Sequence, residues 1–211
     1  MLRLDYRLNL VTDRTLIGER ALEDAVKEAI LGGCTLIQLR EKHADGLEFY
    51  NVGRSLKALT DQYQIPLIVN DRLDIALALD AAGLHIGQSD IPASVARRLL
   101  GPEKCLGVSA SSLEEAIQAE ADGADYLGVG ALFPTTTKDK AGTLPLETLI
   151  AIRKAVKIPI VGIGGIHTGN ISDLQGSGID GIAVISAILG TKDIEASSRE
   201  LRDLVQKHLH L

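Results

Sequence analysis

Short apolar runs alternate with longer amphipathic stretches along the whole chain. A short apolar run bounded by turn residues predicts a buried strand, and apolar residues three and four apart predict a helix. Eight strands are expected, at 6–12, 35–40, 66–70, 84–87, 104–109, 126–130, 159–163 and 181–185. Helices are expected at 21–31, 47–62, 72–81, 94–100, 113–122, 146–156, 171–175 and 195–209. The pattern therefore predicts a series of strand–helix units.

Turn residues punctuate these units. Ser111 followed by Glu114 predicts a capping box that opens a helix, with Ser112 as the alternative first residue of the box. Glycines are expected to stop helices before the next strand at Gly32, Gly33, Gly83, Gly123 and Gly178. The local signals thus agree with the boundaries that the apolar pattern predicts.

Strands that recur between helices predict a parallel sheet, and eight such units close into a TIM barrel. The predicted fold class is therefore α/β, a single (β/α)8 TIM barrel. An open doubly wound sheet is the alternative, but it would need fewer strands or a clear edge strand. Because no linker-like segment divides the chain, residues 1–211 are expected to form one TIM-barrel catalytic domain. Functional residues of such barrels follow the strand ends.

Composition narrows the classes of partner. The chain has 45% hydrophobic and 24% charged residues, as folded soluble proteins do. Its net charge of -6 disfavours nucleic acid and anionic membranes as partners. Polar residues interrupt the first segment, and no apolar stretch is long enough to span a membrane. Cys34 and Cys105 stand among apolar neighbours, which indicates a reducing compartment, so we expect a cytoplasmic protein.

The second predicted strand ends in a basic segment. Side chains two apart share a face, so Gln38, Arg40 and Lys42 point one way while Leu39 and Glu41 point the other. The apolar side should meet the helices, which directs the polar trio toward the barrel axis. A guanidinium there needs a negative partner. An anion site is favoured by the accompanying lysine and glutamine, and a salt bridge from Arg40 to a neighbouring acid is the alternative.

Two aspartates follow adjacent strands. Asp71 comes directly after the third predicted strand, and Asp90 comes shortly after the fourth. Neighbouring strands lie about 4.8 Å apart, so the two carboxylates are expected to converge and to need a cation between them. Oxygen ligands without a His or Cys cluster indicate one Mg²⁺ per subunit. The alternative is that each aspartate caps the helix that follows it.

Two further strand ends carry hydroxyl groups. Ser109 ends the fifth predicted strand and has no capping role, so it is a candidate contact to a phosphate or a ring nitrogen, or else a plain turn residue. The connection at 131–143 is long and holds Thr135, Thr136, Thr137 and Lys138, which could wrap an anion as a lid. A solvated connection without a function is the alternative.

The seventh and eighth strand ends predict a phosphate site. Gly164 and Gly165 allow a phosphate to approach backbone N–H groups, and Ser186 can open a short helix. This pair of loops is the usual phosphate site of such barrels. The role of His167 stays open: it is either a general base or a loop residue. Cations and metal at one half of the mouth suit a diphosphate, and glycines at the other suit a monophosphate, so two phosphorylated small molecules are the expected partners.

These strand ends together resemble the thiamine-phosphate synthase family over essentially the whole chain. The resemblance lies in Gln38-Leu39-Arg40-Glu41-Lys42, Asn70-Asp71-Arg72, His85-Ile86-Gly87-Gln88 with Asp90, Gly107-Val108-Ser109, Pro134-Thr135-Thr136-Thr137-Lys138, Gly162-Ile163-Gly164-Gly165 and Val184-Ile185-Ser186. It implies that hydroxymethylpyrimidine diphosphate and thiazole phosphate are joined, with Mg²⁺, to give thiamine phosphate and diphosphate. It also implies a dissociative route, in which diphosphate leaves before the thiazole nitrogen attacks the pyrimidinylmethyl cation.

The resemblance also implies a role for each matching residue. The metal falls to Asp71 and Asp90, and the catalytic roles fall to Arg40, Lys42, Ser109 and Lys138. The pyrimidine diphosphate falls to Gln38, Leu39, Arg40, Glu41, Lys42, Asn70, Ser109 and Lys138. The thiazole phosphate falls to Thr135, Thr136, Thr137, Gly165, Ile185 and Ser186. Two alternatives stay open: a thiazole tautomerase on a similar barrel, which needs no pair of metal carboxylates, and a non-catalytic barrel that binds a phosphorylated precursor and regulates a partner.

Overall fold

The computed structural model describes residues 4–135 and 142–209. Eight parallel strands pair in chain order from β1 to β8, and β8 pairs with β1, so the sheet is a closed barrel. The strands are β1 (Leu8–Val11), β2 (Leu36–Leu39), β3 (Leu67–Asn70), β4 (Gly83–Ile86), β5 (Cys105–Ala110), β6 (Tyr126–Val129), β7 (Ile160–Ile163) and β8 (Gly181–Val184). This confirms the predicted (β/α)8 TIM barrel.

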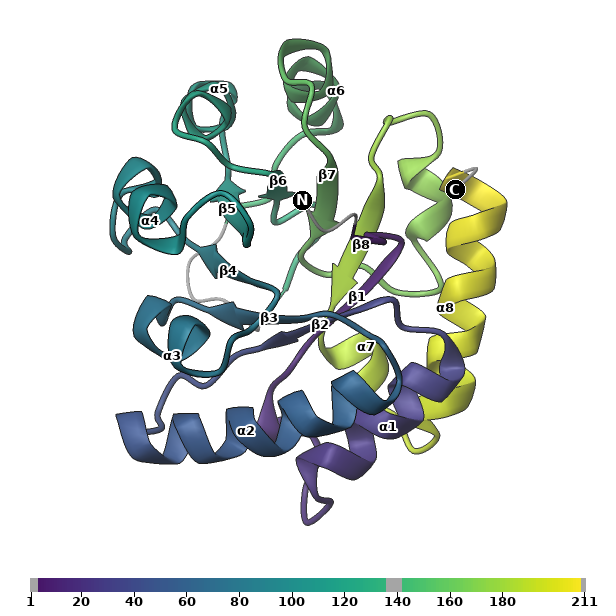
Figure 1. Ribbon diagram of the computed structural model, residues 1–211. Helices are drawn as coiled ribbons and strands as arrows, with labels where there is room; N and C mark the ends of the chain where they lie inside the picture. The colour runs from purple at the N-terminus through teal and green to yellow at the C-terminus, as the bar shows by residue number, and fades with distance from the viewer. Residues whose placement is uncertain (1–3, 136–141, 210–211) are drawn as a thin grey trace.

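Helices form a ring around the barrel (Figure 1). They are α1 (Leu22–Gly32), α2 (Gly46–Gln62), α3 (Leu73–Ala78), α4 (Ala93–Leu100), α5 (Leu113–Ala121), α6 (Leu146–Ala155), α7 (Ser186–Leu189) and α8 (Ile194–Leu209). Two 3-10 helices, η1 (Arg14–Leu16) and η2 (Ile171–Leu174), complete the described elements. None of the described helices is long and apolar enough to cross a membrane.

Two predicted boundary signals are wrong. Gly83 does not stop a helix but begins β4, because the chain already turns at Asp80, whose φ of 48° is left-handed. The capping box opens at Ser112 and not at Ser111. Ser112 Oγ accepts a hydrogen bond from the Glu115 backbone N–H at 3.2 Å, and the Glu115 carboxylate accepts one from the Ser111 N–H at 2.6 Å. The box is therefore one residue further along than Ser111 and Glu114.

The barrel interior is filled at its amino-terminal end. Inward side chains of the strands pack against one another there, and the cluster comprises Leu4, Val11, Leu36, Ile68, Cys105, Tyr126, Val161 and Ala183. Outward side chains of the same strands pack against the helices and form the larger core. Cys34 and Cys105 are both buried and unpaired. Since the interior is filled at this end, the space left inside the barrel lies at the carboxyl ends of the strands.

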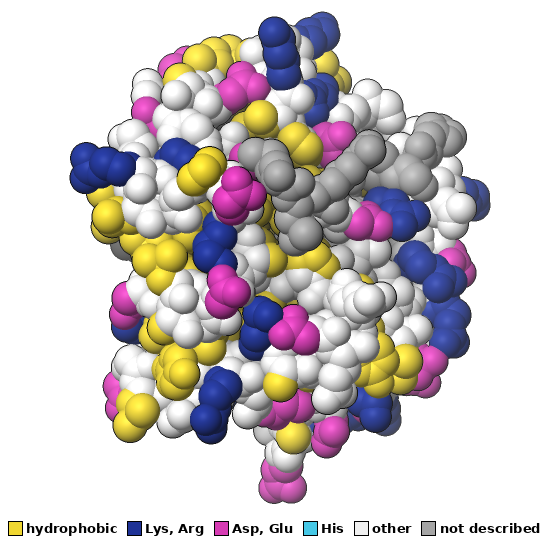
Figure 2. All heavy atoms as spheres, in the orientation of Figure 1, with side chains coloured by type: hydrophobic (Ala, Val, Ile, Leu, Met, Phe, Trp, Pro, Cys, Tyr) yellow, Lys and Arg dark blue, Asp and Glu magenta, His cyan; other side chains and the backbone are white. Residues whose placement is uncertain are grey.

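Acidic and basic side chains are interspersed on the outer surface of the face drawn in Figure 2. A strong single-sign field is the electrostatic feature that steers polyanions to a protein. The described side chains on the face drawn in Figure 2 form no such single-sign patch.

Gly181, the first residue of β8, tests the closure of the barrel. A Cβ at this position would lie 1.7 Å from the Tyr6 backbone oxygen, so Gly181→Ala must push the segment before β1 away from β8. We expect the free energy of unfolding, measured by urea denaturation, to fall by about 2–3 kcal/mol, as overpacked cores do. Gly142→Ala is the control, because nothing lies within 4 Å of its Cβ position. Equal stability of the two variants would contradict this close approach.

Candidate functional site

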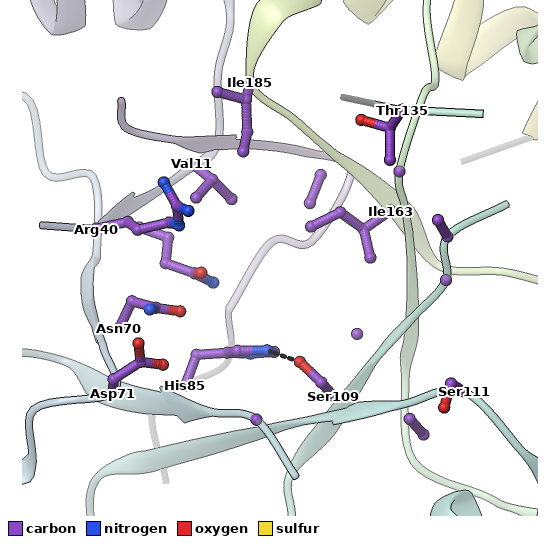
Figure 3. A pocket seen from close by; sticks show the side chains of 18 of the residues that line it. Val11, Arg40, Asn70, Asp71, His85, Ser109, Ser111, Thr135, Ile163 and Ile185 are labelled. Atoms are coloured by element: carbon purple, nitrogen blue, oxygen red, sulfur yellow. Dashed lines mark hydrogen bonds between the residues drawn. The ribbon is translucent and has the colours of Figure 1, made fainter. Parts of the chain in front are cut away.

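A cavity of about 430 Å³ opens at the carboxyl ends of the strands and draws lining residues from all eight of them. Its walls include most of the residues predicted from the sequence, at strand ends that are far apart in the chain (Figure 3). Those residues are Gln38, Arg40, Lys42, Asn70, Asp71, Asp90, Ser109, Thr135, Gly165, Ile185 and Ser186. The barrel therefore brings the predicted groups together in one mouth.

Five predicted residues need separate mention. Leu39 is fully buried among the outward core residues, and the Glu41 carboxylate accepts a hydrogen bond from Arg14 Nη2 at 2.6 Å. Both side chains thus point away from the cavity, as the period of two in β2 requires, and the assignment of these side chains to the substrate is corrected. Thr136, Thr137 and Lys138 lie outside the described residues.

Arg40 meets both expectations drawn from the sequence, because it faces the predicted anion site and also pairs with a neighbouring acid. Its guanidinium lines the cavity, and its Nη1 lies 3.2 Å from Asp13 Oδ2. Its backbone N–H donates to Thr12 Oγ1 at 2.9 Å, which ties the ends of β1 and β2 together. Asp13 therefore neutralises and orients a cation that still faces the mouth. The sequence predicted an acidic partner for Arg40 as an alternative without identifying it, and the structure shows that this partner is Asp13.

Asp71 and Asp90 lie in the same mouth. Asp71 has a φ of 65°, and its Oδ2 lies 2.5 Å from Lys42 Nζ. Asp90 Oδ2 accepts a hydrogen bond from the Gly87 N–H at 2.7 Å. Burial raises the pKa of Asp90 above its usual value, and the neighbouring Asp71 carboxylate raises it further, although the Gly87 N–H opposes both. The two carboxylates are thus close enough to repel each other.

The alternative helix-cap role of these aspartates is wrong. The N-cap residue of α3 is Arg72, and the N-cap residue of α4 is Pro92. Among the described residues, no group of three or more His, Cys, Asp or Glu side chains converges as a protein-only metal cage would. A pair of carboxylates leaves positions for water and substrate oxygens, which is how Mg²⁺ is commonly held. The donor set therefore fits Mg²⁺ better than Zn²⁺.

His85 lines the cavity and is hydrogen-bonded to Tyr126, which is buried in the barrel interior; the sequence analysis gave neither residue a role there. His85 Nε2 lies 2.9 Å from Ser109 Oγ, the contact dashed in Figure 3, and His85 Nδ1 lies 2.9 Å from Tyr126 Oη. A Cβ at Gly107 would lie 2.5 Å from His85 Nδ1, and one at Gly128 would lie 2.9 Å from His85 Cε1. Gly107 and Gly128, on the two strands that follow β4, leave room inside the barrel for the His85 ring. Glycines at these two inward positions are the feature of the sequence that could have predicted a large inward side chain on β4.

The opposite half of the mouth is made of glycines and small hydroxyl residues. Gly164 and Gly165 have φ values of 96° and 66°, and a Cβ at Gly165 would lie 2.4 Å from the Pro134 backbone oxygen. Ser186 begins α7 directly after β8, as predicted. His167 Nδ1 accepts a hydrogen bond from the Gly169 N–H at 3.1 Å, so it acts as a loop residue.

The two halves differ in chemistry. Figure 3 shows Arg40, Asn70, Asp71 and His85 on one side of the cavity, with Thr135 and Ile163 across from them. Charged and amide groups thus gather over β2 to β4, whereas apolar and neutral groups line the side of β6 to β8. Such a division suits a ligand that carries several negative charges at one end and a less charged group at the other.

Comparisons with known proteins agree with this geometry. The family model described as thiamine monophosphate synthase matches residues 8–188. Thiamine-phosphate synthase of Ruminiclostridium cellulolyticum is 54% identical over 202 residues, covering 96% of each chain. That of Clostridium beijerinckii is 53% identical over 201 residues, covering 95% of this chain and 96% of the relative.

A comparison with solved structures shows the same family relationship. The structure of thiamine phosphate pyrophosphorylase from Pyrococcus furiosus has a TM-score of 0.89 and 43% identity, and the match covers 97% of this chain and 98% of that one. A 3-hexulose-6-phosphate synthase structure, with a TM-score of 0.66 and 16% identity over 94% of this chain and 99% of that one, shares the fold alone. By its sequence, its barrel and the residues at its strand ends, the chain belongs to the thiamine monophosphate synthase family.

Proposed function

We propose that this chain, a transferase of thiamine biosynthesis by its family, joins two phosphorylated precursors in the cavity of the barrel. The precursors are 4-amino-2-methyl-5-hydroxymethylpyrimidine diphosphate and 4-methyl-5-(2-phosphoethyl)thiazole, or the carboxylated form of the latter. The products are thiamine phosphate and diphosphate. The observation that carries this proposal is the convergence of Asp71 and Asp90 beside Arg40 and Lys42 in one mouth. The whole chain, residues 1–211, is proposed to act as one catalytic domain.

The diphosphate of the pyrimidine substrate is assigned to the half of the mouth over β2 to β4. Arg40 and Lys42 would contact its oxygens, and Arg40 is already oriented by Asp13 at 3.2 Å. Charge-assisted hydrogen bonds from such preorganised cations strengthen as negative charge grows on the departing diphosphate. Gln38, Asn70 and Ser109 would hold the rest of this substrate, and Lys138 completes the proposed set.

One Mg²⁺ per subunit is proposed between Asp71 and Asp90. The fit rests on the mutual repulsion of these two carboxylates, which a bound cation would relieve, and on their freedom from helix capping. When bound there, Mg²⁺ would neutralise diphosphate oxygens and make diphosphate a better leaving group. Lys42 Nζ, 2.5 Å from Asp71 Oδ2, holds that carboxylate in place.

The described residues favour a dissociative route. In this route the bond from the pyrimidine methylene carbon to the diphosphate oxygen breaks first, and the thiazole nitrogen then attacks the cation. No protein nucleophile takes part in these two steps. Val11, Ile163 and Ile185 form apolar parts of the wall, which would exclude water from the short-lived cation.

The thiazole phosphate is assigned to the neutral half of the mouth. Gly165 and the start of α7 at Ser186 present backbone N–H groups there, and Ile185 lies between the two halves. Thr135, which lines the cavity, is proposed to bind the same phosphate together with Thr136 and Thr137. This arrangement would point the thiazole ring toward the pyrimidine across the cavity.

We propose a cytoplasmic location as well. Both thiols are buried and unpaired, and burial raises the pKa of Cys34 and of Cys105 to about 12, so neither is poised to form a disulfide. Such thiols agree with a reducing compartment.

The dependence on Mg²⁺ tests the proposed function directly. Incubation of the protein with both precursors and Mg²⁺ should release diphosphate and form thiamine phosphate, because the cation offsets charge on the leaving group. Excess EDTA should abolish release, and added Mg²⁺ should restore it. Release that persists in excess chelator would contradict the metal assignment. Absence of release under every condition, with retained precursor binding, would favour the regulatory binding module, and thiazole isomerisation without diphosphate would favour the tautomerase.

Asp71→Asn tests the acidic pair without disturbing the backbone. Asparagine tolerates the left-handed φ of 65° at this position, so the fold should be kept. We expect turnover to fall by about 100-fold, on the scale of losing one preorganised electrostatic group, while the melting temperature stays within about 2 °C of the unchanged protein. Steady-state kinetics with thermal unfolding measures both.

Asp74→Asn is the matched control, because Asp74 is exposed and pairs with Arg72 outside the cavity. It should leave turnover unchanged. An unchanged turnover number in Asp71→Asn would remove Asp71 from the site, and equal losses in both variants would indicate a general effect of charge.

A further inference from the structure

Four polar side chains form a hydrogen-bonded row between the barrel interior and the cavity. They come from four different strands: Gln38 from β2, Tyr126 from β6, His85 from β4 and Ser109 from β5. Tyr126 is 1% exposed, Gln38 4% and His85 7%, so these three are shielded from water. A polar row this deeply buried is costly unless its donors and acceptors match, which means that its hydrogen atoms have a defined order.

The order starts at Tyr126. The Gln38 side chain hydrogen-bonds to the Tyr126 hydroxyl in a way that favours the charged phenolate, as a donor to the phenol oxygen does, while burial holds the pKa of Tyr126 well above its usual value. The phenol therefore keeps its hydrogen, and Gln38 donates to the phenol oxygen. The phenol hydrogen then points to the other neighbour of Oη, which is His85 Nδ1 at 2.9 Å. A neutral imidazole that accepts at Nδ1 carries its own hydrogen on Nε2.

The second half of the row follows from that tautomer. His85 Nε2 lies 2.9 Å from Ser109 Oγ, so the imidazole donates to the serine oxygen. The serine hydrogen is then directed away from His85, and Ser109 lines the cavity. Gln88 Nε2 donates to the Ser109 backbone oxygen at 2.6 Å, which fixes the end of β5. Ser109 is thereby presented to the cavity as a hydrogen-bond donor.

We propose that Tyr126 is a positioning residue, which fixes the Nε2–H tautomer of His85 so that Ser109 donates its hydroxyl hydrogen to an acceptor atom of the bound pyrimidine diphosphate. The identity of this ligand rests on the proposed function, whereas the order of hydrogen-bond donors and acceptors along the four side chains does not. Inward Gly107 and Gly128 support the proposal, since a Cβ at either site would clash with His85. The strands beside the imidazole are built to hold that ring in place.

The tautomer can be measured on the unmodified protein. In protein labelled with ¹⁵N at its five histidines, the two ring nitrogens of a neutral imidazole give distinct shifts. We expect His85, assigned by loss of its signals in His85→Gln, to carry hydrogen on Nε2 at neutral pH without any ligand. A hydrogen on Nδ1, or on both nitrogens, would overturn the proposal. This result does not depend on activity, so it stands apart from failure of the proposed function.

Kinetics of a double-mutant cycle then test the route through Ser109. Tyr126→Phe should lower kcat/KM for the pyrimidine diphosphate by about tenfold, the scale of one hydrogen bond to a fixed group. Ser109→Ala should lower it by at least as much. The double variant should show no further loss beyond Ser109→Ala, because Tyr126 acts through that hydroxyl.

A purely structural role for Tyr126 predicts another pattern, because its ring packs against Tyr6 with centroids 4.9 Å apart. Tyr6→Phe is the matched control: it removes a hydroxyl from the ring that packs against Tyr126, and that hydroxyl pairs with Cys105 Sγ at 3.6 Å. We expect it to keep kcat/KM and the His85 signals unchanged, whereas Tyr126→Phe should give a mixture of both tautomers. Additive losses in the cycle, or an equal loss in Tyr6→Phe, would overturn the proposal.

Discussion

Closure of eight parallel strands into a barrel is the constraint on which the site depends. Alternate side chains of each strand must point inward, and the inward positions near the carboxyl ends then share one small space. Residues as distant in sequence as Val11 and Ser186 therefore line the same cavity. The amino-terminal half of the interior is packed mostly with apolar side chains, and the polar inward residues of the site lie near the carboxyl ends of the strands.

Electrostatics then divide the cavity. Two carboxylates that repel each other lie beside Arg40 and Lys42, so this half holds charges of both signs within a partly dehydrated space. Such an arrangement suits a bound polyanion and its metal better than it suits an empty protein. The opposite half has backbone N–H groups and glycines and no comparable cluster of charge among its described lining residues. The chemistry we propose uses this asymmetry, because only one of its two phosphorylated groups must depart.

The sequence predicted the fold and much of the site because both depend on patterns that repeat over a few residues. Alternating strand and helix patterns predicted the barrel, and the alternation of side chains along a strand predicted which of them point inward. A period of two placed Gln38, Arg40 and Lys42 inward and Glu41 outward, as the structure has them. The order of strands placed Asp71 and Asp90 side by side. Contacts between side chains of different strands have no such period, which is why Asp13 beside Arg40 and Tyr126 beside His85 emerged only from the structure. Gly83 was misjudged for a related reason: glycine serves both as a turn residue and as space for a neighbouring strand.

The central claim is that Asp71 and Asp90 hold a divalent cation against the diphosphate of the substrate. The most direct measurement is a crystal grown with Mn²⁺, diphosphate and thiamine phosphate, from which an anomalous difference map locates the manganese. We predict one peak within coordination distance of a carboxylate oxygen of Asp71 and of Asp90, with diphosphate oxygens against Arg40 and Lys42. Diphosphate bound in the cavity with no anomalous peak between the two aspartates would contradict the account.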